Sequence, residues 1–514
     1  MRTRVWHLAI VAYVLVYGIL CVCAGFRTHF HVALNDFWGN LYMADHLDFR
    51  NPGSFFCGFF PFGYALLLKA VFFGNPIVSA CIANVFFGGV LLGAVAWWGL
   101  KTIGPKWTLL TVAAVSIAPK MFEYITLPGP DIGAAALAVL GGVLLIHSMV
   151  HESPDQRSWK GVVLGGIFCG LSALMRYHCL VLAVGLVVST ALFSKSFFRH
   201  SALGFAGVFS VYALQMAVNI LSGHGLFETS ASFNAYKLVG FIDWNQISAV
   251  IDRIPRSVIR IFFSAPHLFI SGYASALMRV LPYLIPSMLC VFTLKDNGRV
   301  RVHAAILTAS FVYFVVVCWS SERVVIPVLP FVLYSAADFA KSLTANVRAR
   351  FVDLRLEIAA ATLTVCILLA LQVALFVQSD WYIVKIRKNA NDLFREVENE
   401  LMKSGVTDPK EVFTSSFDFY LPRINCCHPY RSGGWLRYSY PEYRKKYPEL
   451  SGRTMEVFLA DCRAYGITHL VLDRKAYGVS VDLGRLYEGS IQPKGISRLA
   501  EISGFKVFKV SGDS

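Results

Sequence analysis

Long apolar runs separated by short polar segments dominate the first 380 residues of the chain. Residues 6–26 form the first run, which is long enough to cross a bilayer because a spanning helix needs about 20 residues. The pattern recurs and predicts about eleven transmembrane helices. The predicted spans are 6–26, 76–100, 106–122, 132–150, 161–175, 179–194, 201–222, 275–294, 302–320, 324–340 and 358–380.

Positive residues gather in every second loop between these runs. The short loops on the opposite side contain little beyond Arg176 and Arg323. Because cytoplasmic loops carry the excess of lysine and arginine, the N-terminus and the loops at 151–160 and 295–301 are predicted to be cytoplasmic. Three larger regions are then predicted on the other side of the membrane: 27–75, 223–274 and 381–514.

Composition supports an α-helical polytopic membrane protein. Of 514 residues, 56% are hydrophobic and only 15% are charged, whereas a soluble chain carries about a quarter charged residues. The net charge of +15 comes largely from the predicted cytoplasmic loops. It therefore gives no support for nucleic-acid binding.

The tail after residue 380 is polar and predicts a small α/β domain. Residues 388–405 have helical periodicity, with Leu393, Val397 and Leu401 on one stripe and Gly405 as a C-cap. Residues 411–416, 468–473 and 505–510 have the pattern of strands.

The cysteines of the tail offer one candidate disulfide and no zinc motif. In an oxidising compartment, Cys426 or Cys427 could bond to Cys462. The sequence contains no CxxC…CxxC pattern, which makes a zinc site unexpected.

The first outer loop contains two stretches that are too apolar for a free loop and too short to span the membrane. Residues 37–47 and 61–74 are predicted to be helices at the membrane interface. Asp36 precedes the first of them, so an aqueous carboxylate is expected beside a membrane-anchored substrate.

Five sequence features occur in this order along the chain: Asn35-Asp36, PFGYALLL (61–68), LPGPDIG (127–133) with Asp131, LMRYH (174–178) and SERVVIPVLP (321–330) with Arg323. Together they resemble the GT-C superfamily of glycosyltransferases. The resemblance is greatest to the branch that contains protein O-mannosyltransferases and the lipid A aminoarabinose transferases. It covers residues 1–380. Those enzymes usually have Asp-Glu where this chain has Asn35-Asp36, with one carboxylate.

The resemblance implies transfer of a sugar, a hexose or a pentose, from a polyprenyl-phosphate donor to a lipid, glycan or protein acceptor outside the cytoplasm. The acceptor hydroxyl needs a general base, for which Asp36 is the first candidate, with Asp131 assisting or orienting. Arg176, His178 and Arg323 are the candidates to stabilise the departing phosphate, and Tyr177 belongs to the same substrate-binding motif. No cofactor is required, although a divalent cation is compatible with the chemistry. The absence of an endoplasmic-reticulum or Golgi retrieval signal favours a bacterial inner membrane.

Structural roles compete with these assignments. Asp131 follows Pro130 and is also suited to cap a helix. Arg176 and Arg323 are also suited to pair with Glu123 and Glu322 as structural bridges. Arg253, Arg256 and Arg260 are interpreted as an interfacial face that contacts lipid headgroups. His29 and His31 have no carboxylate or cysteine neighbours, which disfavours a metal site there. The aromatic and basic segment 435–450 is interpreted as a packed and solvated surface.

Three other functions remain open at this stage. A secondary transporter is disfavoured because the chain has no matching halves and no acidic residue near the centre of a predicted span. An O-antigen-ligase-like enzyme with a pyrophosphate donor would use the arginines, His224 and His267 of the 223–274 loop. A non-catalytic member of the superfamily would use the tail as a binding module.

Overall fold

The structure is a computed structural model of the whole chain. It describes residues 2–27, 35–56, 60–71, 76–148, 158–194, 196–223, 225–226, 283–317, 325–348, 392–415, 420–421, 426–427, 450 and 454–511. The chain divides into two compact units, one of residues 1–23 with 43–380 and one of residues 24–42 with 381–514.

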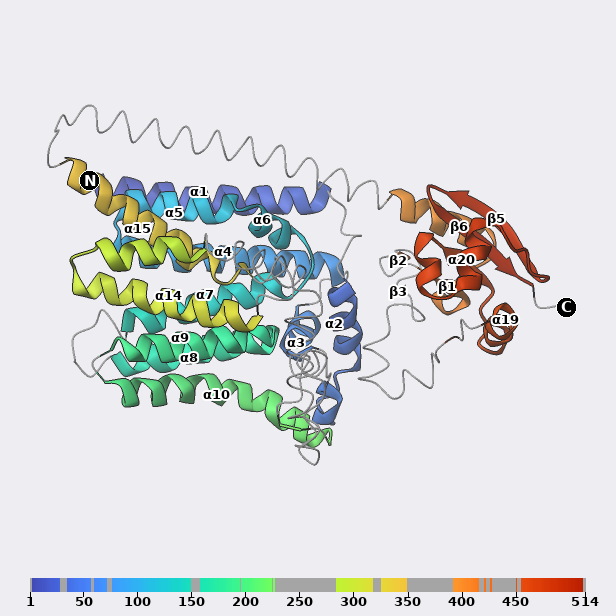
Figure 1. Cartoon of the computed structure of the whole chain (residues 1–514), viewed down its shortest axis with the longest axis horizontal. Coiled ribbons are helices and arrows are strands. Elements are labelled where there is room, and N and C mark those ends of the chain that lie inside the picture. Colours follow the sequence, from blue (N-terminus) through green and yellow to red (C-terminus); the bar gives the residue numbers. More distant parts are fainter. Residues whose placement is uncertain are drawn as a thin grey trace, which may run out of the picture. The chain divides into compact units, whose positions relative to one another are not determined.

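Helices make up the described part of the first unit (Figure 1). A further helix covers Tyr283–Thr293. The labelled elements up to residue 348 are α1 (Arg2–Arg27), α2 (Asn35–His46), η1 (Pro52–Phe55), α3 (Gly63–Ala70), α4 (Pro76–Thr102), α5 (Pro105–Ile117), α6 (Pro119–Thr126), α7 (Asp131–Ile146), α8 (Ser158–Met175), α9 (His178–Leu192), α10 (Phe197–Leu221), α14 (Asn297–Val317) and α15 (Leu329–Arg348).

Several helices present apolar side chains on the outside of the bundle. Leu8 and Leu15 of α1 and Phe86 of α4 are each more than 60% exposed. Among the described residues, three helical segments are long and apolar enough to span a bilayer: Trp6–Cys23, Val78–Thr102 and Phe197–Leu221. Shorter apolar helices include Asp131–Ile146, Trp159–Met175 and His178–Leu192. Exposed apolar surface of this extent fits helices that face lipid.

The predicted span 106–122 is wrong as a single helix. The helix α5 ends at Ile117, and α6 begins at Pro119. Proline lacks the amide hydrogen that would continue the α5 ladder, and it moves the preceding residue out of the helical region. Ala118 accordingly has φ −52° and ψ 121°. The predicted span 358–380 lies outside the described residues, so the total of about eleven spans stays a prediction.

Glycines let the central helix α8 approach two neighbours closely. On one side, a Cβ at Gly165 would lie 2.9 Å from the carbonyl oxygen of Gly141 in α7. On the other side, a Cβ at Gly166 would lie 3.0 Å from the Cα of Gly207 in α10. Small residues at such contacts are the usual means of packing helices inside a membrane.

The bundle has two ends, which α7 connects. Asp131 is the first residue of α7, and His147 directly follows its last residue, Ile146. A helix of this length spans roughly 24 Å at 1.5 Å per residue. We call the two ends of the bundle the Asp131 end and the His147 end.

The second unit contains a four-stranded sheet. Its strand order is β1–β4–β6–β5, in which β1 (Val412–Thr414) runs parallel to β4 (His469–Leu472) and the other pairs are antiparallel. The strands β5 and β6 cover Ile496–Ile502 and Phe505–Val510. Val397 and Leu401 of the helix at 392–403 pack in one core with Val471 and Val507.

The predicted helix and strands of the tail are confirmed. Gly405 has φ +97° at the end of the helix, a left-handed conformation that glycine adopts without strain. The possible disulfide to Cys462 is wrong, because Cys462 is a buried free cysteine. The sequence analysis missed β5, the short strands β2 (Tyr420–Leu421) and β3 (Cys426–Cys427), and the helices α19 (Met455–Ala464) and α20 (Val481–Glu488).

Candidate active site

A buried ion pair lies at the Asp131 end of the bundle. The Nη2 atom of Arg176 donates to Oδ2 of Asp131 at 2.9 Å, and the two side chains are only 10% and 4% exposed. The residues are 45 positions apart, and both are predicted site residues. The structure therefore brings together a guanidinium and a carboxylate that the sequence placed on different segments.

Local structure explains how each partner reaches this position. Asp131 opens α7, where the positive end of the helix dipole favours a carboxylate. Arg176 lies in the turn after α8 ends at Met175. The hydroxyl of Ser172, one turn earlier in α8, donates to the carbonyl of Ala134 at 2.7 Å and so ties α8 to the first turn of α7.

The structural alternative for Asp131, a helix N-cap, is wrong. Pro130 occupies the N-cap position of α7, and no side-chain capping bond is formed there. The carboxylate of Asp131 accepts from Arg176 instead. The carboxylate of Asp131 is thus paired with a guanidinium in a buried environment.

Tyr64 of α3 is a member of this site that the sequence analysis did not single out. Its side chain is fully buried, and it interacts electrostatically with both Asp131 and Arg176. Burial raises the pKa of its hydroxyl well above the usual value, so the group is a neutral donor at physiological pH. The backbone of Gly129 is close enough to this hydroxyl to oppose the rise in its pKa, although no hydrogen bond of good geometry forms within the described part of the chain.

Close packing fixes α3 against the bundle. A Cβ at Gly63 would lie 2.5 Å from the carbonyl oxygen of Leu174, so only glycine allows this approach of α3 to the end of α8. The amide of Phe62 donates to Oε1 of Gln215 in α10 at 3.2 Å. These contacts place Tyr64 next to the turn that carries Arg176. The signal in the sequence was the tyrosine of the PFGYALLL motif.

Tyr177 and His178 share the turn with Arg176. Tyr177 is buried at the N-cap position of α9, and the half-buried His178 is the first residue of that helix. The ring centroid of His178 lies 6.3 Å from that of Tyr313 in α14. Both residues are therefore at the Asp131 end, and His178 reaches toward a different helix.

The remaining site predictions fall partly or wholly outside the described residues. Asp36 lies in the first turn of α2, but its side chain is not among those described. Arg323 and Glu322 lie outside the described residues, so their roles stay predictions. The same holds for His29, His31, His224, Arg253, Arg256, Arg260, His267 and nearly all of segment 435–450.

No cluster of three or more histidine, cysteine, aspartate or glutamate side chains with metal-binding geometry occurs among the described residues. The Arg176–Asp131 pair offers one carboxylate, which a guanidinium already engages. A divalent cation at this end would need ligands from other parts of the chain.

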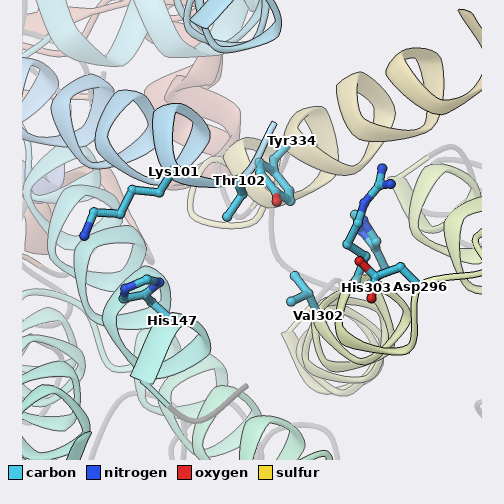
Figure 2. Close-up of a pocket in the computed structure, with 8 residues that line it drawn as sticks. Lys101, Thr102, His147, Asp296, Val302, His303 and Tyr334 are labelled. Carbon is cyan, nitrogen blue, oxygen red and sulfur yellow. The ribbon is translucent and has the colours of Figure 1, made fainter. Parts of the chain in front are cut away.

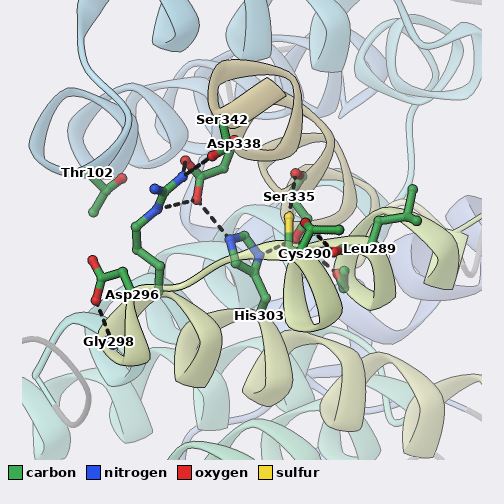
Figure 3. A network of polar contacts seen from close by, with 12 residues as sticks. Thr102, Leu289, Cys290, Asp296, Gly298, His303, Ser335, Asp338 and Ser342 are labelled. Carbon is green, nitrogen blue, oxygen red and sulfur yellow. Dashed lines mark hydrogen bonds and ion pairs between the residues drawn. The ribbon is translucent and has the colours of Figure 1, made fainter. Parts of the chain in front are cut away.

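A second buried ion cluster lies at the His147 end (Figure 3). Asp338 of α15 accepts from Nε of Arg299 at 3.0 Å, and its Oδ2 lies 2.9 Å from Nε2 of His303. The other ring nitrogen of His303 lies 3.0 Å from the hydroxyl of Ser335. Asp338 is 1% exposed and lies in the middle of α15, because that helix extends to Arg348.

This cluster does not contradict the expectation that no acidic residue lies near the centre of a span, because it lies at the His147 end of the bundle. The predicted span ended at residue 340, which placed Asp338 at its edge. Arg299, 39 residues away, pairs with the carboxylate, and a ring nitrogen of His303, 35 residues away, lies within hydrogen-bond distance of it. The cluster joins α14 to α15, which is a structural role for a buried charge.

The whole chain matches solved structures in fold. ArnT from Cupriavidus metallidurans bound to undecaprenyl phosphate is similar with a TM-score of 0.62 and 12% sequence identity, over 99% of both chains. The apo form of ArnT matches with a TM-score of 0.58 over 100% of both chains. The chain has the GT-C fold.

A more distant GT-C structure is also similar. The Archaeoglobus fulgidus oligosaccharyltransferase in complex with zinc and sulfate matches with a TM-score of 0.50 and 10% identity, over 93% of this chain and 70% of the other. No protein-family model matches the sequence. No curated protein matches it either. The predicted resemblance to the GT-C superfamily is thus confirmed at the level of the fold.

Proposed function

We propose that the chain is a membrane glycosyltransferase that moves a sugar from a polyprenyl-phosphate donor to an acceptor outside the cytoplasm. The observation that carries this proposal is the buried Arg176–Asp131 pair at one end of a GT-C bundle. The ArnT structure that the chain matches over 99% of its length holds undecaprenyl phosphate, which supports a lipid phosphate as the ligand.

The proposed reaction exchanges one bond at the anomeric carbon of the sugar. The oxygen of the acceptor hydroxyl attacks this carbon, and the bond from the carbon to the phosphate oxygen breaks. The hydroxyl proton passes to the carboxylate of Asp36, which acts as general base. The bond electrons leave with the polyprenyl phosphate, whose negative charge needs a fixed cation.

Arg176 is the proposed cation. Its guanidinium is preorganised because one nitrogen is held by Asp131 at 2.9 Å. Charge-assisted bonds from arginine to phosphate are about twice as strong as neutral ones, and the buried setting strengthens them further. Asp131 is engaged by Arg176, which makes it a positioning residue rather than the base. His178, Tyr177 and Arg323 are proposed to complete the donor site.

The acceptor and donor are proposed to meet on the extracytoplasmic side. Lysine and arginine concentrate at the loops of the His147 end, which the positive-inside rule assigns to the cytoplasm. Nucleotide sugars are cytoplasmic donors and would approach the wrong end of the bundle. We propose a bacterial inner membrane as the location, with the C-terminal unit outside.

Tyr64→Phe tests the donor site without disturbing the fold. We expect transfer to fall roughly tenfold, because a neutral hydrogen bond to the substrate contributes about 0.5–1.5 kcal/mol. Thermal stability should change little, since the hydroxyl forms no hydrogen bond of good geometry among the described residues. Transfer rates and unfolding temperatures of the purified protein check this.

The matched control is Tyr212→Phe, which removes another buried tyrosine hydroxyl, in α10, and should leave transfer unchanged. Equal transfer by Tyr64→Phe and wild type would exclude a role for Tyr64.

Lipid analysis of cells tests the proposed function as a whole. Cells without the protein should accumulate one polyprenyl-phosphate sugar and lose one surface glycan. Both changes should reverse when the wild-type chain is restored. Unchanged lipid and glycan profiles under conditions where the protein is produced would contradict the proposal.

A further inference from the structure

The segment 127–130, which joins α6 to α7, contains two prolines. The helix α6 ends at Thr126, and the sequence LPGP follows it. In a continuing helix, the carbonyl of Tyr124 would accept from the amide of residue 128, and the carbonyl of Thr126 from that of residue 130. Both positions are proline, which has no amide hydrogen to donate. These two carbonyls therefore need donors from another part of the fold.

The helix α4 supplies these donors. The side-chain nitrogen Nδ2 of Asn84 donates to the carbonyl oxygen of Tyr124 at 3.3 Å and to that of Leu127 at 2.7 Å. One turn earlier, the thiol of Cys81 donates weakly to the carbonyl of Thr126, with Sγ 3.8 Å from the oxygen. Side chains of α4 thus replace the bonds that the two prolines remove.

Close packing holds Asn84 at this position. Its side chain is buried, with 1% of the residue exposed. One turn later in α4, a Cβ at Gly88 would lie 3.0 Å from Cδ1 of Ile125, so the missing side chain lets α4 approach α6. A buried amide costs free energy unless it is hydrogen-bonded. The bonds from Asn84 therefore fix the segment 127–130 against α4.

This segment leads directly into the donor site. Asp131 follows it and accepts from Arg176 at 2.9 Å. A Cβ at Gly129 would lie 3.7 Å from Oδ2 of Asp131, so the backbone of the segment runs beside the carboxylate. The same backbone is close to the hydroxyl of Tyr64. The position of the segment therefore sets how the guanidinium and the tyrosine hydroxyl lie relative to one another.

We propose that Asn84 is a positioning residue for the binding of the donor phosphate. By holding the segment 127–130, it fixes the Arg176–Asp131 pair and Tyr64 in the arrangement that binds the phosphate. Groups of a binding site have to be held within about 0.5 Å of the productive geometry, which a backbone segment without its own hydrogen bonds does not ensure. The inference rests on the proposed function, because it assigns the lipid phosphate to this end of the bundle.

The test measures binding of radiolabelled undecaprenyl phosphate to the purified full-length protein in detergent. Undecaprenol, which has the same chain without the phosphate, reports the binding of the chain alone. Asn84→Leu removes both bonds to the carbonyls and keeps roughly the volume of the side chain. Asn84→Ser is the second variant, for the case that leucine prevents folding, because its shorter side chain does not bridge the two carbonyls.

The matched control is Ser287→Ala, which removes another buried hydrogen bond between two helices. The hydroxyl of Ser287 donates to that of Ser335 in α15 at 3.0 Å. This contact belongs to the His147 end, where Tyr334, the neighbour of Ser335, lines a cavity of about 260 Å³ together with His147 (Figure 2). The control should leave the binding of both lipids unchanged.

We expect the wild type to bind undecaprenyl phosphate more tightly than undecaprenol. Asn84→Leu should bind the phosphate roughly tenfold more weakly, as expected for residues coupled in one network, and should bind undecaprenol as the wild type does. In the double variant Arg176→Met/Asp131→Leu, adding Asn84→Leu should change the affinity by less than about twofold, because the positioned guanidinium is already gone.

Equal weakening by Asn84→Leu with and without the Arg176–Asp131 pair would overturn the proposal, because Asn84 would then act independently of the pair. Equal losses for undecaprenyl phosphate and undecaprenol would also overturn it and make Asn84 purely structural. A wild type that prefers the phosphate, with folded Asn84 variants of the same affinity, would exclude only the role of Asn84. A wild type that binds both lipids equally would contradict the proposed donor site itself.

Discussion

Replacing Asp36 with asparagine should abolish sugar transfer and leave the fold and donor binding intact. The amide is nearly isosteric with the carboxylate, but it cannot take the proton of the acceptor hydroxyl at neutral pH. Loss of a general base typically lowers the rate about 100- to 10,000-fold. The measurement compares transfer from a polyprenyl-phosphate donor with separately measured donor binding.

Two neighbouring substitutions serve as controls for Asp36→Asn. Asn35→Asp adds a second carboxylate to the same turn of α2 and should change the rate much less. Asp131→Asn should have an intermediate effect, because it weakens the hold on Arg176 and removes no base. Wild-type turnover by Asp36→Asn would end the assignment of this residue as base. Lost donor binding by a folded Asp36→Asn protein would assign it to substrate binding instead.

Removing Arg176 should affect both stability and transfer. In Arg176→Met, the buried carboxylate of Asp131 loses its counter-ion, and breaking such a pair costs about 3–5 kcal/mol in the free energy of unfolding. The double variant Arg176→Met/Asp131→Leu removes both charges and should recover most of that stability, because apolar replacement of a buried pair is often neutral. Thermal unfolding in detergent measures both effects.

The double variant separates a structural role of the pair from a role in transfer. If Arg176 binds the donor phosphate, the double variant should be stable yet bind the donor more weakly by about 1.5–3 kcal/mol. Arg176→Lys should restore donor binding only in part, because lysine lacks the planar fork of the guanidinium. A stable double variant with full transfer would make the Arg176–Asp131 pair purely structural.

The sequence predicted the individual helices well because their apolar periodicity is strong. The helices α1, α4 and α10 begin and end within a few residues of the predicted spans. The break at Pro119 was missed because the apolar run continues through it, although the backbone hydrogen bonds do not. The end of α15 was missed because the helix continues past residue 340, the end of the predicted span, as a more polar helix.

The candidate site was predictable only as a set of residues on separate segments. The sequence named Asp131 and Arg176, but their 2.9 Å contact depends on how α7 and α8 pack through Gly141 and Gly165. Tyr64 joins them because Gly63 lets α3 approach the end of α8. Such through-space contacts follow from helix packing, for which a single sequence carries no periodic signal.

A transfer assay with purified components tests the central claim most directly. The donor is the polyprenyl-phosphate sugar isolated from cells that lack the protein, carrying a label in the sugar, and the acceptor is an extract of the same cell envelopes. The account predicts that the purified protein moves the label to the acceptor and releases an equal amount of free polyprenyl phosphate. A folded protein that binds this donor but leaves the label on it, or that moves label only from a nucleotide sugar, would contradict the account.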